Sequence, residues 1–391
     1  MRVPKNFLWS GIASGVKRSG RLDLGIAYSS YPATVAAVFT ENKLAAPPVV
    51  EARRRLKKNR KFRGIVANSG VANAATGQRG FELNNRMIAS TARLLGLEEN
   101  EVLSASTGVI GEDLPVDTIE AALPVAVDNL AETVTGFSRA ILTTDSGPKL
   151  ATRKIETLDA TLIGVAKGAG MINPSMATML VFLFLDHPVK ADWWQQSLQN
   201  ASDSTFNRIS VDGDMSTNDT LLAMAADIPG KKPVDAGHPA AGELSDALTG
   251  VCSELSELIV ADGEGATCVM KINVSGALDD AQARLVAEEI AGSTLVKTAF
   301  YGCDPNWGRV FSSVGASGAE VDSEKLNLAI NGETVFSSGR PLGISERLEE
   351  TMKQQDQHLI EVDLGLAAGS ATRLTCDLSE EYVKINSAYR S

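Results

Sequence analysis

The segment Lys167–Leu180 (KGAGMINPSMATML) holds the residues of this chain best suited to covalent chemistry. Within it, Thr178 stands between the small residue Ala177 and an apolar run. A threonine hydroxyl is a useful nucleophile only when a base lies beside it. If the chain is cut between Ala177 and Thr178, the new α-amine, with a pKa near ~8, can act as that base from within the same residue. By itself, however, a threonine that opens a strand is more often structural.

The elements around this segment must hold it in place. Residues 159–166 predict a strand before it, and Met179–Leu185, apolar on both faces, predicts a strand buried between two layers. Apolar residues at helical spacing predict helices that contain Leu83–Leu95, Leu244–Ile259 and residues 281–290. We also expect two short strands around a turn within 24–40, a strand at Val102–Ser106 that ends at Thr107, and an exposed loop at 227–240. Because strands and helices mix without a regular βαβ alternation, these patterns favour a layered α/β sandwich.

Length and charge narrow the class of protein. A chain of 391 residues is too long for one small core and predicts two packed subdomains. Its net charge of −11 argues against nucleic acid as a partner. We interpret the basic run Arg53–Arg63 as a solvated helix end and loop. The longest apolar run, Met179–Leu185, is far short of the roughly 20 residues that span a bilayer, so we expect a soluble protein with no membrane partner.

The cysteines and glycines give no sign of a metal or cofactor site. The four cysteines stand far apart and the chain has three histidines, so neither a disulfide framework nor a zinc site is expected, and a reducing cytoplasm is the predicted location. The glycine pairs at 168–170 and 263–265 do not complete the GxGxxG pattern of dinucleotide binding. We therefore expect no cofactor and no metal.

A set of short motifs, in order along nearly the whole chain, resembles the ornithine acetyltransferase family of arginine biosynthesis. Each motif alone is weak, but their order is highly specific. They are 32–40 (PATVAAVFT), 68–77 (NSGVANAATG), 106–111 (STGVIG), 143–145 (TTD), 167–171 (KGAGM), 176–180 (MATML), 207–208 (NR), 211–214 (VDGD), 216–220 (STNDT), 262–266 (DGEGA), 297–298 (KT), 302–309 (GCDPNWGR) and 382–391 (YVKINSAYRS).

The resemblance implies a fold, a maturation step and a reaction. The fold is a four-layer α-β-β-α sandwich with a second, smaller α/β subdomain. Cleavage between Ala177 and Thr178 gives an α chain, 1–177, and a β chain, 178–391. Thr178 then carries an acetyl group from N-acetylornithine to glutamate in a ping-pong cycle. The family also assembles as paired heterodimers, so an α2β2 or higher assembly is expected.

The resemblance also implies roles for particular residues. Thr107 and Gly108 match the oxyanion hole, in which a hydroxyl and a backbone N–H stabilise the tetrahedral intermediate. The remaining matches are to substrate-binding positions. They are Thr143 or Thr144, between which spacing does not choose, Lys167 for a carboxylate, Glu264 for the side-chain ammonium of ornithine, and Asn386 with Ser391 in the tail.

The chain departs from the family pattern at three places. Family members commonly carry His where this chain has Asn173, Asn where it has Ser175, and Gly-Asn-Ala-Asn where it has 70–73 (GVAN). The first two differences flank the active segment and leave the acyl acceptor open. Four alternatives therefore stay open: an amide hydrolase or aminopeptidase of the same fold, a paralogue of a secondary pathway, a non-catalytic binding protein, and acetyl-CoA as an additional donor.

Overall fold

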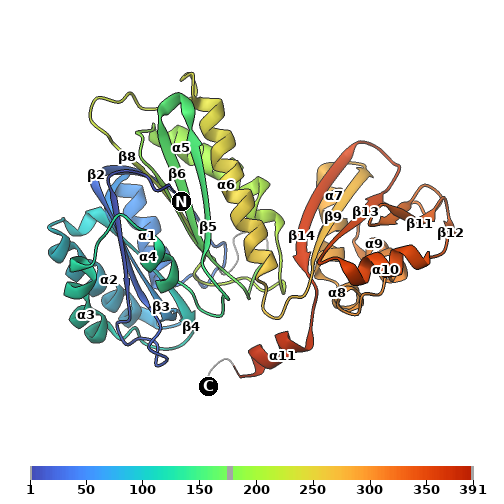
Figure 1. Ribbon diagram of the computed structural model, residues 1–391, viewed down its shortest axis with the longest axis horizontal. Coiled ribbons are helices and arrows are strands. Elements are labelled where there is room, and N and C mark those ends of the chain that lie inside the picture. The colour runs from blue at the N-terminus through green and yellow to red at the C-terminus, as the bar shows by residue number, and fades with distance from the viewer. Residues whose placement is uncertain (1, 174–178, 389–391) are drawn as a thin grey trace. The chain divides into compact units, whose positions relative to one another are not determined.

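A computed structural model of the chain describes residues 2–173 and 179–388. The chain forms two compact units (Figure 1). Unit 1 contains Met1–Asn207 and Asp214–Ile259, and unit 2 contains Arg208–Gly213 and Val260–Ser391. The prediction of two subdomains in a mixed α/β protein is confirmed, and each unit is described by itself below.

Unit 1 is built on a mixed sheet that has eight strands among the described residues. The strand order is β4-β3-β2-β8-β7-β6-β5, and β1 pairs with β2 outside this path. The strands are β1 Phe7–Ile12, β2 Leu24–Phe39, β3 Lys61–Val71, β4 Val102–Val109, β5 Lys149–Ile155, β6 Ala160–Lys167, β7 Leu180–Leu185 and β8 Thr220–Ala226. Every residue of β6, β7 and β8 is buried, as expected for central strands covered on both faces.

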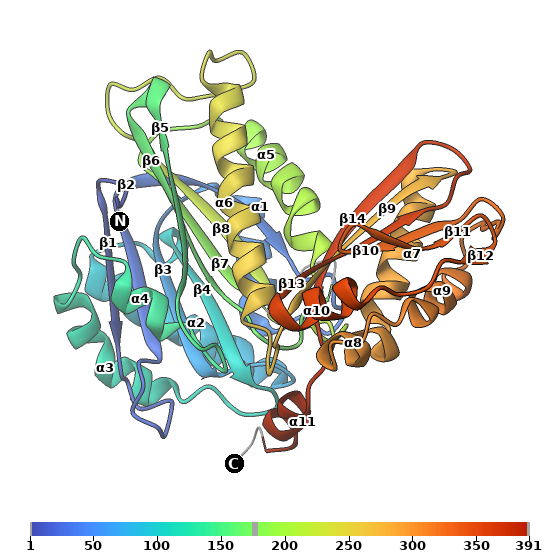
Figure 2. The ribbon, with the colours of Figure 1, turned by 45° about the vertical axis from the view of Figure 1, so that its right-hand side comes forward.

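Helices cover the sheet of unit 1 (Figure 2). They are α1 Pro47–Lys58, α2 Gly77–Leu95, α3 Val116–Asp128, α4 Thr135–Ala140, α5 Ala191–Ser204 and α6 Ala241–Ala261. Helices α2 and α3 share a hydrophobic cluster with Leu24, Ile26 and Val66 of the sheet. Gly164 of β6 leaves room for α6, because a Cβ there would lie 2.6 Å from side-chain atoms of Val251 and Leu255.

The structure corrects the prediction of two short strands within residues 24–40. Strand β2 is continuous from Leu24 to Phe39. Its first half pairs with β1 and its second half pairs with β8, and its register with β3 shifts between Tyr28 and Ala33. The Pro32 nitrogen, which has no hydrogen to donate, falls inside this shift, where the ladder is interrupted. The turn-like sequence is therefore a bulge at which one strand exchanges partners.

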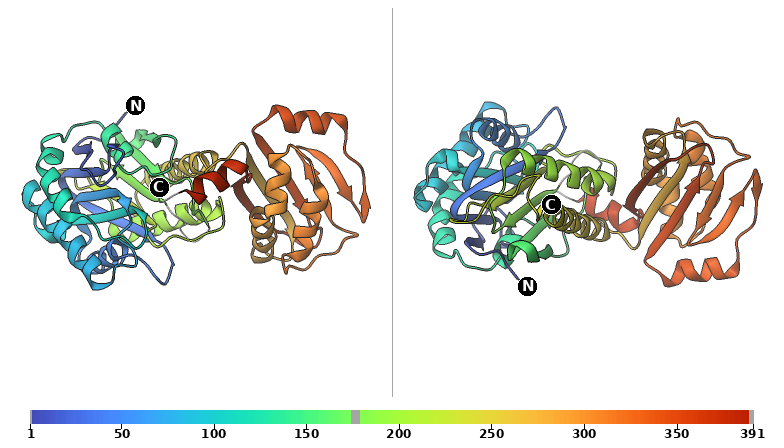
Figure 3. Two further views of the ribbon diagram at one scale, coloured as in Figure 1. Left: turned by 90° about the horizontal axis from the view of Figure 1, so that it is seen from below. Right: turned by 90° about the horizontal axis from the view of Figure 1, so that it is seen from above.

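Unit 2 has a six-stranded sheet among the described residues, with the order β12-β11-β10-β13-β9-β14. Figure 3 shows its helices beside the sheet. The elements are β9 Val269–Ala277, α7 Asp280–Gly292, α8 Thr294–Tyr301, α9 Trp307–Ala316, β10 Asn327–Ile330, β11 Glu333–Ser337, β12 Arg340–Pro341, α10 Glu346–Gln354, β13 Gln357–Asp363, β14 Gly369–Cys376 and α11 Glu380–Ser387. One hydrophobic cluster joins the sheet to α7, α8, α9 and α10.

Most of the predicted elements near the active segment are confirmed. Helices α2, α6 and α7 and strands β6 and β7 lie where the apolar patterns place them. The Asp279 carboxylate accepts the Gln282 N–H at 2.9 Å and so caps the start of α7. The basic run ends α1, continues through a short connection at residues 59–60, as predicted, and then enters strand β3, which was not predicted there. All four cysteines are free, and no helix within residues 2–173 or 179–388 is long and apolar enough to cross a membrane.

Candidate active site

The candidate oxyanion residues lie at the end of β4, on a backbone that requires glycine. Thr107 is buried, and Gly108 has a φ of +132°. In the parallel pairing of β3 with β4, Gly108 stands opposite Gly70. A Cβ on Gly108 would lie 2.2 Å from the Gly70 carbonyl carbon, so no larger residue fits without moving the strand.

The side chain of Lys167, at the end of β6, contacts a residue near the end of β4. Its side chain is buried, and its Nζ lies 3.4 Å from the Thr107 Oγ1. Across the antiparallel pair of β6 and β7, Lys167 stands opposite Leu180, two residues after Thr178 in the chain. The structure therefore connects the strand of the candidate oxyanion residues, the candidate substrate-binding lysine and the strand that follows the candidate nucleophile.

A buried carboxylate, Asp145, organises this group. It accepts the Gly168 N–H at 2.6 Å, the Lys149 ammonium at 2.7 Å and the Thr143 N–H at 3.0 Å. Burial acts to raise the pKa of Asp145, but Lys167 and Lys149 outweigh it and hold that pKa at about 2. Asp145 is therefore ionised and fixes the backbone at Thr143. Thr144 is half-buried like Thr143, so the structure does not choose between the two threonines.

A second lysine, Lys17, lies close enough to Lys167 for their charges to interact. Its Nζ donates to the Leu142 carbonyl at 2.6 Å and to the Leu22 carbonyl at 3.0 Å. Its stem covers Gly70, where a Cβ would lie 3.1 Å from the Lys17 Cγ. Burial lowers the pKa of Lys17 to about 8, a shift that the charge of Lys167 increases and that of Asp23 opposes. Sequence motifs gave Lys17 no role.

In unit 2, Glu264 and Asn386 are brought together. The Asn386 Nδ2 donates to the Glu264 Oε2 at 2.8 Å. Gly265, at a φ of +70°, allows α11 to approach this loop, because a Cβ there would lie 2.6 Å from the Tyr382 nitrogen. The Ser379 hydroxyl donates to the Gly265 carbonyl at 2.6 Å, and the Tyr382 hydroxyl donates to Asp212 at 3.1 Å. The structure thus brings two of the predicted substrate-binding residues, one from the acidic loop and one from α11, into contact within unit 2.

Three predicted residues, Ala177, Thr178 and Ser391, lie outside the described residues. Two residues with no predicted role, Asn218 and Asp219, contact segments on both sides of the site. Their signal in the sequence is a pair of polar residues directly before the fully buried strand β8.

Within the described part of the chain, no group of three or more His, Cys, Asp or Glu side chains could hold a metal ion.

Two mixed sheets with covering helices, together with Gly108 and the buried side chains of Thr107 and Lys167 at strand ends, define a mixed α/β protein with a candidate acyl-transfer site. The chain belongs to the ArgJ family, which matches residues 8–391. This finding confirms the family resemblance that the motifs indicate.

Individual relatives agree with this assignment. The arginine biosynthesis bifunctional protein ArgJ of Geobacter sulfurreducens is 42% identical over 391 residues, 99% of each chain. The crystal structure of the protein of the same name from Bacillus halodurans is 38% identical and covers 53% of this chain and 98% of its own, with a TM-score of 0.50. The ornithine acetyltransferase of Mycobacterium tuberculosis, solved with ornithine, is 32% identical and covers 46% of this chain and 94% of its own, with a TM-score of 0.42.

Proposed function

We propose that this protein transfers the acetyl group of N-acetyl-L-ornithine to L-glutamate through an acetyl ester on Thr178. Cleavage between Ala177 and Thr178 precedes the reaction and divides the chain into residues 1–177 and 178–391. Membership of the ArgJ family and the arginine biosynthesis named for its relatives support this proposal.

One observation carries the proposal: the Lys167 Nζ, at the end of β6, lies 3.4 Å from the Thr107 Oγ1, near the end of β4. A buried cation next to a hydroxyl and a glycine N–H is suited to a substrate carboxylate beside a developing oxyanion. Because Leu180 stands opposite Lys167, the chain passes this lysine immediately after Thr178.

The first half-reaction forms the ester and releases ornithine. The Thr178 hydroxyl attacks the acetyl carbonyl carbon while its proton passes to the α-amine of the same residue. The Thr107 hydroxyl and the Gly108 N–H donate to the oxygen that becomes negatively charged. The carbon–nitrogen bond then breaks, and the α-nitrogen of ornithine takes the proton as it leaves.

The second half-reaction returns Thr178 to its starting state. The α-amine of glutamate attacks the ester carbonyl and loses a proton to the α-amine of Thr178. That proton passes to the Thr178 oxygen as its bond to the acetyl group breaks, and N-acetylglutamate leaves. Lys167 binds the substrate α-carboxylate, and Glu264 binds the side-chain ammonium of ornithine. Asn386 orients Glu264 through their 2.8 Å bond, and Ser391 contributes from the end of the tail.

The lengths of the matched chains support the cleavage. The Bacillus halodurans chain is matched over 98% of its length by only 53% of this chain, whereas the full-length relative from Geobacter sulfurreducens matches 99% of it. That solved chain is therefore about half as long as the full-length protein, as one product of a central cut would be. We further propose that the two products pair into an α2β2 or higher assembly.

The cleavage and the nucleophile are tested together by intact mass under denaturing conditions. We expect two chains, 1–177 and 178–391, and the second should gain one acetyl group when N-acetylornithine is added. Thr178→Ala should remain a single chain and gain nothing. A wild-type protein that stays uncut and takes up no acetyl group would refute the proposal.

The acceptor and the donor are tested by a product assay. Ornithine release from N-acetylornithine should depend on glutamate and should yield N-acetylglutamate in equal amount. Release of ornithine at the same rate without glutamate would instead identify an amide hydrolase. Replacing N-acetylornithine by acetyl-CoA in the same assay determines whether the enzyme accepts this second donor.

A further inference from the structure

The amide of Asn218 holds the ends of β3 and β4. Asn218 is buried directly before β8, and its Nδ2 donates to the Ser106 carbonyl at 2.9 Å and to the Ala72 carbonyl at 2.7 Å. Ser106 precedes Thr107, and Ala72 follows the last residue of β3. Both hydrogens of one amide therefore fix the backbone on which the Gly70–Gly108 contact and the candidate oxyanion donors depend.

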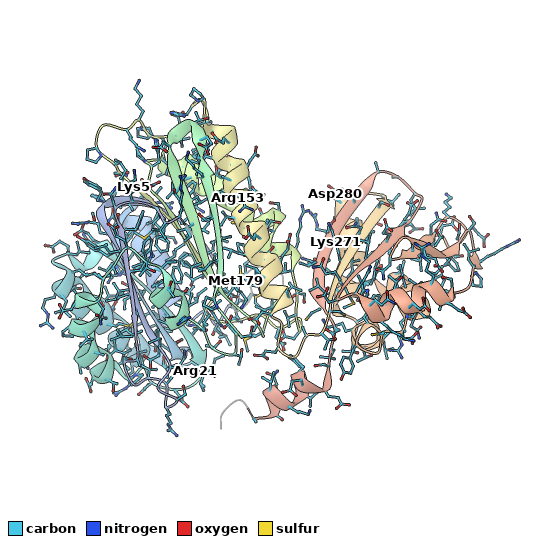
Figure 4. All side chains as sticks on the ribbon, viewed as in Figure 1. Lys5, Arg21, Arg153, Met179, Lys271 and Asp280 are labelled. Carbon is cyan, nitrogen blue, oxygen red and sulfur yellow. The ribbon has the colours of Figure 1, made fainter. Side chains whose placement is uncertain are left out.

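The next residue, Asp219, holds the start of β7. Its Oδ1 accepts the Met179 N–H at 3.0 Å, and the Thr220 N–H donates to the Met179 carbonyl at 3.1 Å. Met179, labelled in Figure 4, is bonded to Thr178. The backbone that follows the candidate nucleophile is thus fixed on both sides by residues 219 and 220.

The environment of Asp219 disfavours the ionised form of its carboxyl group. The side chain is fully buried, and Oδ2 has no hydrogen-bond partner among the described residues. Burial raises the pKa of Asp219 well above its usual range, although the Met179 N–H and the charge of Lys167 oppose the shift. The nearby Thr40 hydroxyl also opposes the rise in the pKa of Asp219. The hydrogen of that hydroxyl, however, is donated to the Ser216 carbonyl at 2.7 Å. The carboxyl group is therefore harder to ionise at this position than in water.

We propose that Asn218 and Asp219 are a positioning pair that sets the separation between the oxyanion donors at Thr107–Gly108 and the backbone of Met179, the residue that follows the candidate nucleophile in the sequence. The pair joins the two halves of the site because the two residues are adjacent and one holds each half. Neither touches the reacting atoms in this scheme. The inference rests on the proposed function, in which Thr178 is the nucleophile.

The first test is Asn218→Asp, which keeps the shape of the side chain but cannot donate to both carbonyls. We expect the rate of self-cleavage and kcat for N-acetylornithine each to fall by about 100-fold, because misplacement by ~1 Å costs that much. The KM should change by less than ~3-fold, since the proposed contacts to substrate remain. The matched control is Asn84→Asp, another buried amide whose Oδ1 accepts the hydroxyl of Ser104 in β4 at 2.8 Å.

The second test separates positioning by Asp219 from a purely structural role. Asp219→Ala removes the bond to Met179, and we expect losses of the same order as in Asn218→Asp. Asp219→Asn keeps the shape of the side chain and an oxygen that can accept the Met179 N–H, so it should restore both rates to within ~3-fold of wild type. Cleavage is followed by gel after cell-free synthesis, kcat and KM by ornithine release, and stability by thermal unfolding.

The outcomes are distinct. Wild-type rates in Asn218→Asp or Asp219→Ala, or an equal loss in the Asn84→Asp control of matched stability, would overturn the inference and leave the proposed function intact. A loss in Asp219→Asn as large as in Asp219→Ala would overturn the positioning role of Asp219, because the carboxyl itself would then be required. Failure of the wild-type protein to cleave would refute the proposed function instead.

Discussion

At the scale of single residues, the site depends on side chains that motif matching left without roles. Thr107, Gly108 and Lys167 are the residues that the family pattern indicates, but Asp145 holds Gly168 and Thr143 in place beside them. A charged residue that fixes backbone N–H groups and neutralises buried lysines contributes to the site without contacting a substrate.

Gly108→Ala tests the close approach of β4 to β3. Its Cβ would overlap the Gly70 carbonyl carbon, so we expect kcat to fall by about 100- to 1,000-fold, as when one oxyanion donor is lost. The control is Gly111→Ala, where φ is also positive, +88°, but where no described residue other than the two chain neighbours has an atom within 4 Å of the new Cβ. That variant should lose only ~1–2 kcal/mol of unfolding free energy and keep its activity. Equal kcat in the two variants would contradict the argument.

Asp145→Asn tests the buried charge cluster. Removing one partner of a buried pair should cost about 3–5 kcal/mol of unfolding free energy at pH 7, measured by urea unfolding. Because the pKa of Asp145 is lowered to about 2, its contribution is complete above the unfolded value near 3.8 and disappears as the pH falls through about 2. The difference from wild type should therefore shrink below pH ~3.

The control for this measurement is an exposed pair. Asp113 bonds Arg79 at 2.6 Å, and both side chains are more than half exposed. Asp113→Asn should cost less than ~1 kcal/mol and show no comparable pH dependence. If Asp145→Asn were no more destabilising than Asp113→Asn, the buried cluster would not stabilise unit 1.

At the scale of elements, the proposed cleavage point lies between two paired strands. Strand β6 precedes it and β7 follows it, and they pair from Lys167↔Leu180 to Leu162↔Leu185. Strand β8 also follows the cut, and it pairs with β2, which precedes the cut. The two chains thus share one sheet through two separate ladders.

This arrangement predicts that cleavage does not separate the chains. Native mass spectrometry should show the two products together, whereas denaturing conditions should show them apart. The matched sample is Thr178→Ala, which should remain uncut and differ in native mass only by the residue substitution and by the one water that hydrolysis adds to each cleaved chain. Dissociation of the wild-type chains without denaturant would mean that the two ladders do not hold them.

At the scale of the whole molecule, the proposed chains do not coincide with the two compact units. Unit 1 contains residues from both sides of the cut, up to Asn207 and again from Asp214 to Ile259. In its sheet, β8 and β7 lie between β2 and β6. Residues 1–177 alone therefore lack the two central strands that join β4-β3-β2 to β6-β5.

It follows that unit 1 must fold before the chain is cut. Residues 1–177 expressed alone should show no cooperative thermal unfolding, and mixing them with separately expressed 178–391 should give little or no activity. The control is the full chain, refolded from denaturant in the uncut Thr178→Ala form, which should regain a cooperative transition. Cooperative unfolding of 1–177 alone would show that the central strands are dispensable.

The sequence alone determines the local part of this structure. The all-apolar run that forms β7 and the periodic faces of α2, α6 and α7 are predicted because burial imposes a pattern on neighbouring residues. The ordered motifs also indicate the family and the residues Thr107, Gly108, Lys167 and Glu264. The predicted turn between two short strands within residues 24–40 was wrong, since local turn signals do not reveal that β2 continues through a bulge.

Only the tertiary structure decides which distant residues cooperate. Asn218 lies 112 residues from Ser106, with which it bonds, and Asp219 lies 40 residues from Met179. Lys167 meets Thr107 across 60 residues. Such contacts depend on the order of strands in the sheet, which leaves no periodic trace in the sequence. The physical reason is that hydrophobic patterning specifies which face of an element is buried, whereas the chain topology specifies what that face and the strand ends meet.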